Sequence, residues 1–166
     1  MSTASPNPST VGRRTPADHL ATARRYAANP DDWPLAPRFD PLRRWYHRLA
    51  AEPDAEVWLL SWLPGQGTDL HDHGGSAGAF VVVSGTLTEY TVKTPPGSAP
   101  RLASDSLHPG DGRAFGAHHI HQITNAATQP AVSLHVYGPA LREMTRYHIA
   151  GGQLLVTAVD RAGADW

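Results

Sequence analysis

The sequence of 166 residues contains no cysteine, almost no net charge and no long apolar run. Without cysteine the chain can form no disulfide, carry no thiolate nucleophile and build no zinc–thiolate site, so nitrogen and oxygen atoms must hold any metal. The formal net charge is −1, with 14 Lys and Arg against 15 Asp and Glu. We therefore expect no nucleic-acid partner and no charge-driven partner, but a small ligand instead.

No stretch approaches the run of about 18 apolar residues that a membrane-spanning helix needs, and the N-terminal residues lack the apolar core of a secretory signal. Residues 1–14, MSTASPNPSTVGRR, are rich in Ser and Pro instead. The length suits one domain with a substantial core. We expect a disordered tail over residues 1–14 and a single domain over residues 15–166, in a cytoplasmic protein that avoids membranes and is a monomer or a weak oligomer.

The segment after the tail has the start and stop signals of one helix. Thr15 suits the N-cap position, Pro16 the first helical position and Asp18 the first turn, and Pro30 ends the pattern. A short helical segment at the N-terminus is therefore predicted.

Six later segments are short, rich in β-branched and aromatic residues, and separated by Gly and Pro. They cover residues 56–63, 78–85, 87–94, 131–138, 145–150 and 153–159, and residues 94–100, TPPGSAP, are typical of a loop. Many short strands separated by turns indicate a sandwich or a small barrel, so the expected fold class is all-β. Sites in such barrels lie inside, where inward-facing side chains converge.

A pair of histidines, His71 and His73, ends the stretch GQGTDLHDH at residues 65–73. In a strand, residues i and i+2 point to one face, so both imidazoles would point together while Asp72 points away. This geometry suits a chelated metal ion. The alternative is a hydrogen-bonded polar pair at the rim of a barrel.

The residues around this pair favour the metal. Gly65 stands six residues before His71, and Asn125 stands four residues after His121. This spacing resembles the two signature motifs of the cupin superfamily, a group of small β-barrels or jelly rolls, with Gly78 where many cupins have a glutamate ligand. The metal ligands that the resemblance implies are His71, His73 and His121.

Longer runs resemble the cysteine dioxygenase family, the thiol-oxidising branch of the cupins. These runs are residues 61–89, 120–125 and 131–139. Trp62 ahead of the histidine pair, Ser76 after it and the run SLHVY before a proline carry the resemblance, which covers roughly residues 39–139. It implies Fe(II) as the cofactor and an enzyme that adds both atoms of O2 to L-cysteine, giving cysteine sulfinate.

Three neutral imidazoles would leave a divalent ion with its full charge and, in an octahedral metal, with three open positions. Such a site favours anionic ligands, and a thiolate, an amine and O2 could fill the positions. The usual facial triad of non-haem iron has two histidines and a carboxylate, so a site without the carboxylate has more room for a negatively charged thiol substrate.

The run SLHVY places Ser133, His135 and Tyr137 at alternate positions, so in a strand all three face one way. Buried polar groups need partners, and a Ser–His–Tyr relay would satisfy them in turn. The resemblance implies that this relay places the tyrosine hydroxyl beside the bound substrate. The alternative is a solvated outer face. The cysteine that is crosslinked to this tyrosine in some members corresponds to Gly78, as in many bacterial members, so no crosslink can form.

The resemblance also implies an arginine that binds the substrate carboxylate. The segment YHRL resembles the family's tyrosine-x-arginine strand and puts Arg48 in this role, while Arg43 and Arg44 nearby leave the register open. A guanidinium is a planar fork that matches a carboxylate. Members with arginine here favour cysteine, and members with glutamine favour 3-mercaptopropionate.

Three functions remain open at this point. The first is an iron-dependent cysteine dioxygenase, and the second is a dioxygenase of another small thiol acid such as 3-mercaptopropionate. The third is a metal-binding cupin that isomerises or binds a small metabolite without oxygen chemistry. The resemblance further implies a cis peptide bond at Gly138–Pro139, since only bonds to proline adopt cis at modest cost.

Overall fold

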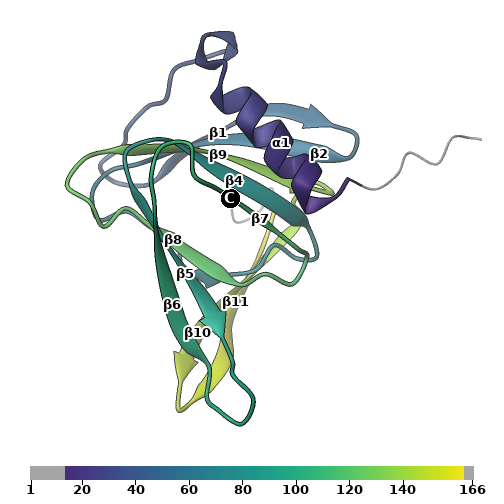
Figure 1. The fold of residues 1–166 in the computed structure, drawn as a ribbon, viewed down its shortest axis with the longest axis vertical. Coiled ribbons are helices and arrows are strands. Elements are labelled where there is room, and N and C mark those ends of the chain that lie inside the picture. The colour runs from purple at the N-terminus through teal and green to yellow at the C-terminus, as the bar shows by residue number, and fades with distance from the viewer. Residues whose placement is uncertain (1–13, 163–166) are drawn as a thin grey trace, which may run out of the picture.

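The structure, a computed structural model, describes residues 14–162 and shows helix α1 (Pro16–Ala27), a 3-10 turn η1 (Pro30–Asp32) and then strands in two antiparallel sheets (Figure 1). The predicted tail lies outside the described residues except for Arg14. The Arg14 guanidinium forms ion pairs with Glu52 and Asp54 at 2.5 and 2.8 Å. This end of the predicted tail is therefore bound to the turn that follows the first strand.

The first sheet has the strand order β1–β2–β9–β4–β7. Its strands are β1 (Trp45–Glu52), β2 (Ala55–Trp62), β9 (Ala131–Gly138), β4 (Ala77–Ser84) and β7 (Gly112–Phe115). The second sheet has the order β11–β10–β3–β8–β5–β6. Its strands are β11 (Gln153–Arg161), β10 (Glu143–Ala150), β3 (Leu70–His71), β8 (His121–Thr124), β5 (Leu87–Lys93) and β6 (Arg101–Leu107). The expected all-β fold with an N-terminal helix is confirmed.

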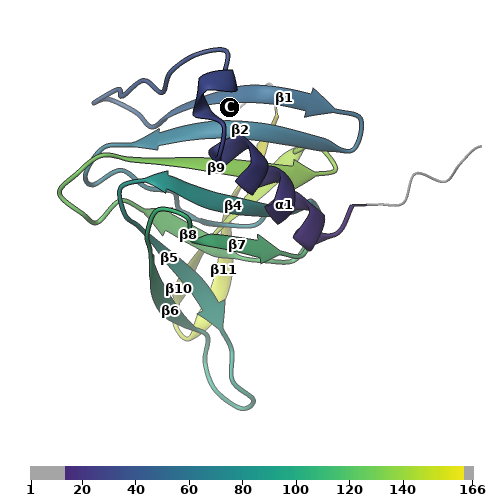
Figure 2. The same ribbon diagram turned by 45° about the horizontal axis from the view of Figure 1, so that its top comes forward.

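Helix α1 crosses the outer face of the first sheet (Figure 2). Thr15 and Asp18 form a capping box, in which each side chain accepts a hydrogen bond from the other residue's backbone N–H, so the predicted helix start is confirmed. Ala23 of the helix is fully buried against the sheet, and the apolar side chains beneath it include Val57, Leu59 and Leu134. The helix therefore closes a second apolar layer outside the barrel.

The main core lies between the two sheets. Strand β9 is buried along its whole length, because one face points into the barrel and the other lies under α1. Val132, Leu134 and Val136 pack in the layer with the helix. The run SLHVY therefore turns its polar face to the interior, and the alternative of a solvated face is wrong.

The segments predicted as strands agree with β2, β4, β5, β9, β10 and β11 to within about two residues at each end, and residues 94–100 form no strand. The spacing rules did not identify β1, β3, β6, β7 or β8, although the resemblance implied a strand at YHRL, within β1. Strand β3 has only two residues, and β6, RLASDSL, is an exposed edge strand with few apolar side chains. Pairing with a neighbouring strand, rather than local pattern, makes these segments extended.

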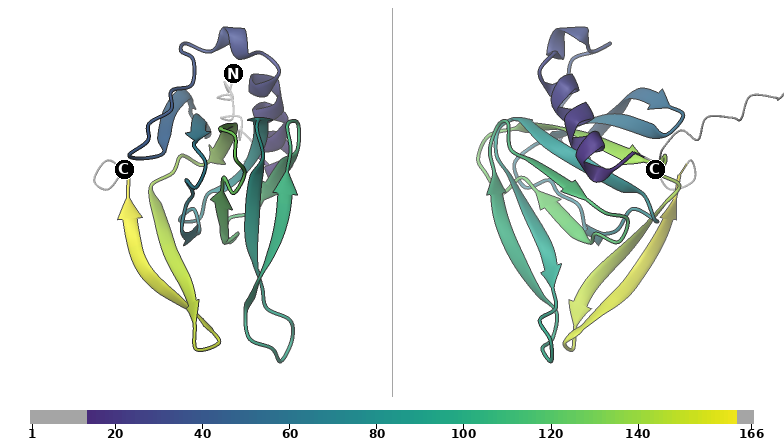
Figure 3. Two further views of the ribbon diagram at one scale, coloured as in Figure 1. Left: turned by 90° about the vertical axis from the view of Figure 1, so that its left-hand side faces the viewer. Right: turned by 45° about the vertical axis from the view of Figure 1, so that its right-hand side comes forward.

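Two long hairpins, β5–β6 and β10–β11, project from the same side of the barrel (Figure 3). The short strands β3 and β8 lie between them in the sheet, where His71 pairs with His121. Histidines that are 50 residues apart in the sequence therefore become direct neighbours in the second sheet.

The peptide bond between Gly138 and Pro139 is cis, as expected. Gly138 has no room for a side chain, because a Cβ atom there would lie 2.7 Å from the carbonyl oxygen of Asp54 and against the ring of His19. Within residues 14–162, none of the helices has the length and apolar character needed to span a membrane.

Candidate metal centre

Three histidine side chains converge inside the barrel. His71 ends β3, His73 follows two residues later, and His121 begins β8, so that their ligand atoms all lie within 4.8 Å of one another. The strand ends at His71 rather than continuing through the pair. Asp72 points away, as expected, and accepts a hydrogen bond of 2.6 Å from the Tyr147 hydroxyl. This contact holds the histidine loop against β10.

Each of these imidazoles has a nitrogen left for a metal. Nδ1 of His71 donates to the carbonyl oxygen of Asp69 at 2.9 Å, and Nδ1 of His121 donates to Oε1 of Glu89 at 2.8 Å, so Nε2 remains in both. Nε2 of His73 is buried and has no hydrogen-bond partner among residues 14–162. An orphaned buried nitrogen is costly. A metal ion bound by the three nitrogens removes that cost, so these residues fit a metal.

Burial keeps these histidines in the form that binds metal. It lowers the pKa of His71 to about 3 and the pKa of His73 well below its usual value, with neighbouring histidines adding to both effects. Burial also lowers the pKa of His121. All three imidazoles are therefore neutral near pH 7, and a neutral imidazole is the metal-binding form.

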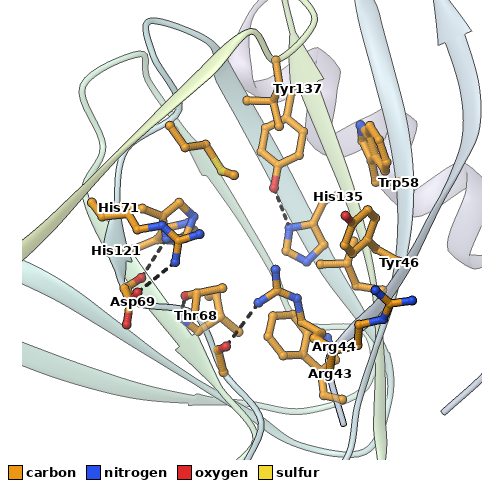
Figure 4. Close-up of a pocket in the computed structure, with 17 residues that line it drawn as sticks. Arg43, Arg44, Tyr46, Trp58, Thr68, Asp69, His71, His121, His135 and Tyr137 are labelled. Atoms are coloured by element: carbon orange, nitrogen blue, oxygen red, sulfur yellow. Dashed lines mark hydrogen bonds and ion pairs between the residues drawn. The ribbon is translucent and has the colours of Figure 1, made fainter. Parts of the chain in front are cut away.

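The polar face of β9 forms a continuous hydrogen-bonded relay. The indole Nε1–H of Trp62 donates to Oγ of Ser133 at 2.9 Å, and this Oγ lies 2.9 Å from Nε2 of His135. Nδ1 of His135 lies 3.1 Å from the Tyr137 hydroxyl (Figure 4). Both nitrogens of His135 are used, so it is not a metal ligand. The sequence predicted Ser133, His135 and Tyr137 as members of the relay. Trp62 was noted there only because it supports the family resemblance.

Packing holds the tyrosine of the relay in place. Gly78 of β4 pairs directly with Tyr137, and a Cβ atom there would lie 2.8 Å from the Phe115 ring. The ring of His73 is stacked on Phe115 at 4.8 Å and lies 5.0 Å from the Tyr137 ring. Phe115 therefore fills the space beside Gly78. No sequence signal marked Phe115 as part of the site.

A pocket of about 390 Å³ opens beside the histidines (Figure 4). Its lining includes Arg44, Tyr46, Trp58, His71, His121 and Tyr137. Nη1 of Arg44 donates to the carbonyl oxygen of Gly67 at 3.2 Å, and its guanidinium lies 4.9 Å above the Trp62 ring. Nε of Arg44 is buried without a partner, and no carboxylate among residues 14–162 pairs with this side chain. Arg44 is therefore a cation that can bind an anionic group in the pocket.

Arg48, which the resemblance put in the substrate-binding role, does not line this pocket. Its guanidinium binds Oε1 of Glu56 at 2.9 Å, and the side chain is half exposed. The short turn between β1 and β2 pairs Glu52 with Ala55, and this register puts Arg48 opposite Trp58. Arg44, four residues earlier, reaches the metal side of the barrel instead.

Comparisons with known proteins agree with this geometry. The family model described as "Cysteine dioxygenase type I" matches residues 15–149. The "Cysteine dioxygenase type 1" of Danio rerio is 29% identical over 124 residues, which cover 69% of this chain and 60% of that protein. The protein of the same name from Rattus norvegicus is 27% identical over 128 residues, 72% of this chain and 62% of that protein. The matches thus span about three fifths of these relatives' length.

Solved structures agree in fold. A sugar phosphate isomerase of the cupin superfamily from Silicibacter pomeroyi has a TM-score of 0.52 at 21% identity, over 74% of this chain and 78% of that one. The protein TT1209 from Thermus thermophilus has a TM-score of 0.53 at 22% identity, over 62% of this chain and 90% of that one. These likenesses show that the fold is an all-β cupin. Because the family model matches well over half of its residues, the chain belongs to the cysteine dioxygenase family of cupins.

Proposed function

We propose that this protein is an Fe(II)-dependent thiol dioxygenase that acts in the cytoplasm on L-cysteine and yields cysteine sulfinate. The observation that carries the proposal is the arrangement of one pocket. Within the described part of the chain, residues 14–162, a buried set of three neutral histidines, with the orphaned Nε2 of His73, adjoins the guanidinium of Arg44, which has no carboxylate partner there. A cupin that only binds a metabolite has no need for the polar relay that ends at the same pocket.

His71, His73 and His121 would hold the ion, which supplies, when bound, open coordination positions and the one-electron chemistry that activates O2. Arg44 binds the carboxylate of the thiol substrate and so directs its sulfur toward the histidines. Tyr46 and Trp58 form part of the wall of this pocket. Both atoms of O2 end on the sulfur, so the reaction needs no external reductant.

The relay sets the direction in which Tyr137 donates. An indole N–H can only donate, so Ser133 accepts from Trp62. We propose the tautomer of His135 in which Nε2 accepts the hydroxyl proton of Ser133. Nδ1–H of His135 then donates to the tyrosine oxygen, which leaves the phenolic proton free for the pocket. Burial raises the pKa of Tyr137, so its hydroxyl is a hydrogen-bond donor and not a base.

The direct test is anaerobic reconstitution with Fe(II), followed by O2 uptake and mass spectrometry on a panel of thiols. We expect one sulfinate per O2 and the highest kcat/KM with L-cysteine. A higher value with 3-mercaptopropionate would show that another thiol acid is the substrate. If the protein binds iron but consumes no O2 with any thiol, it is a metal-binding cupin without oxygenase activity.

Tyr137→Phe should keep its iron and bind thiol normally, because Tyr137 orients the substrate and oxygen without holding the metal. We expect the rate to fall by roughly 10–100-fold, the scale of disturbing a partner beyond the ligands. O2 consumed should also exceed sulfinate formed. Parallel assays of O2 and sulfinate on this variant measure both effects.

Tyr26→Phe is the matched control, since Tyr26 lies on α1 outside the barrel. It should match the wild type in rate and coupling. Wild-type turnover with tight coupling in Tyr137→Phe would mean that the relay on β9 serves the fold only.

A further inference from the structure

A carboxylate that the function proposed above does not use lies beside the metal-binding histidines. Glu89 is an inward-facing residue of β5, and it is only 2% exposed. The preceding inward residue, Leu87, is fully buried in the apolar core. A charged group in such a place is costly unless it is paired. The partners of Glu89 therefore indicate its purpose.

Glu89 has a separate set of partners for each oxygen. Oε1 accepts from Nδ1 of His121 at 2.8 Å and lies 3.2 Å from Nε2 of His119. Oε2 lies 3.4 Å from Nε of Arg113. The strands supply this geometry, because β5 pairs with β8 so that Thr91 lies opposite His121 and Glu89 opposite Ile123. The carboxylate is thus fixed from three directions.

His71 and His121 differ in what holds them. Nδ1 of His71 donates to a backbone carbonyl, which is neutral, whereas Nδ1 of His121 donates to a charged carboxylate. The site has no carboxylate among its proposed ligands, since Gly78 occupies the glutamate position of other cupins. Glu89 supplies a negative charge behind the imidazole of His121, so this charge is separated from the proposed metal position by one imidazole ring.

We infer that Glu89 is a positioning residue that acts on the metal through His121. Glu89 fixes the His121 ring with Nε2 toward His71 and His73 and makes that nitrogen a stronger donor to the metal. This inference rests on the metal site of the proposed function. A hydrogen bond to a carboxylate raises the donor strength of a ligating imidazole, and losing such a partner typically weakens metal binding by 10–100-fold. Glu89 also offsets part of the charge that three neutral ligands leave on a divalent ion.

Glu89, His119 and His121 could also be considered as a second metal site, since their ligand atoms lie close together. The guanidinium of Arg113 beside Oε2 opposes this, because it would repel a cation held by the same carboxylate. Nδ1 of His121 would also have to lose its proton. One metal ion per chain is therefore expected.

The test measures the affinity and stoichiometry of Zn²⁺ and Co²⁺ for metal-free full-length protein, by competition with a chelator of known affinity. Glu89→Gln keeps the shape and the hydrogen-bond acceptor but removes the charge. We expect it to bind both ions 10–100-fold more weakly than the wild type, with an altered visible spectrum of bound Co²⁺. Asp105→Asn is the matched control, because Asp105 also faces Arg113, at 3.6 Å, but is exposed and does not touch His121.

The outcomes separate the inference from the function on which it rests. If the wild type binds no metal, the proposed metal site is wrong. If the wild type binds one ion and Glu89→Gln binds it within twofold of the same affinity, Glu89 does not position the metal. Two ions per wild-type chain would instead support the second site. Should Glu89→Gln not fold, proton and nitrogen-15 NMR of the Zn²⁺-loaded wild type decides. A strongly deshielded Nδ1–H proton of His121 would support the bond to the Glu89 carboxylate, and an ordinary chemical shift would overturn the inference.

Discussion

Replacing His73 with alanine is expected to empty the metal site. Disturbing a residue that merely supports a ligand weakens metal binding by roughly 10–100-fold, so removing a ligand itself should weaken it further. The metal-free protein should stay folded but melt at a lower temperature, because Nε2 of His73 has no hydrogen bond within residues 14–162 to lose, whereas the stacking of its ring on Phe115 is lost. Metal content after reconstitution, measured by atomic emission, and the melting temperature of the metal-free protein check the two halves of this prediction.

His148→Ala provides the control, since His148 is exposed on β10 and lies outside the histidine cluster. This variant should hold as much iron as the wild type. Undiminished iron in His73→Ala would show that the three-histidine assignment is wrong, whatever its activity.

Arg44→Ala is expected to reduce kcat/KM for L-cysteine by about 10²–10³-fold, mainly through KM. Leaving one partner of a buried charged pair without the other costs on the order of 3–5 kcal/mol, and each 1.4 kcal/mol is a factor of ten. Cysteamine has the same thiol and amine but no carboxylate, so its kinetics should change far less. Steady-state O2 uptake with both thiols measures the difference.

Arg48→Ala is the matched control for Arg44→Ala, since it removes a guanidinium from the same segment of chain. Arg48 already binds Glu56 and lies outside the pocket, so its loss should leave the selectivity for cysteine over cysteamine unchanged. Equal losses on both thiols in Arg44→Ala would indicate that Arg44 shapes the pocket without reading the carboxylate.

Local patterns in the sequence were enough to predict the fold class and the histidines at the centre of the candidate site. The cap at Thr15, the alternation in β9 and the histidine pair at residues 71 and 73 each depend on neighbours a few residues away, so they can be recognised without a structure. The spacing of His121 from Asn125 pointed to the third histidine through its resemblance to the second cupin motif, which contains both positions. The absence of cysteine excluded a crosslink to Tyr137.

Everything that depended on the register between strands had to come from the tertiary structure. The choice between Arg44 and Arg48 depends on how the short β1–β2 turn aligns the two strands, and a shift of a few residues moves a different guanidinium to the barrel interior. Glu89 reaches His121 only because β5 pairs with β8, although a carboxylate at an inward position of an apolar strand was a visible signal. Phe115 joins the site by stacking on His73, and Trp62 reaches Ser133 from the neighbouring strand of the first sheet. The sequence by itself therefore determined which residue types could hold a metal, and the pairing of strands far apart in the chain decided which charges surround it.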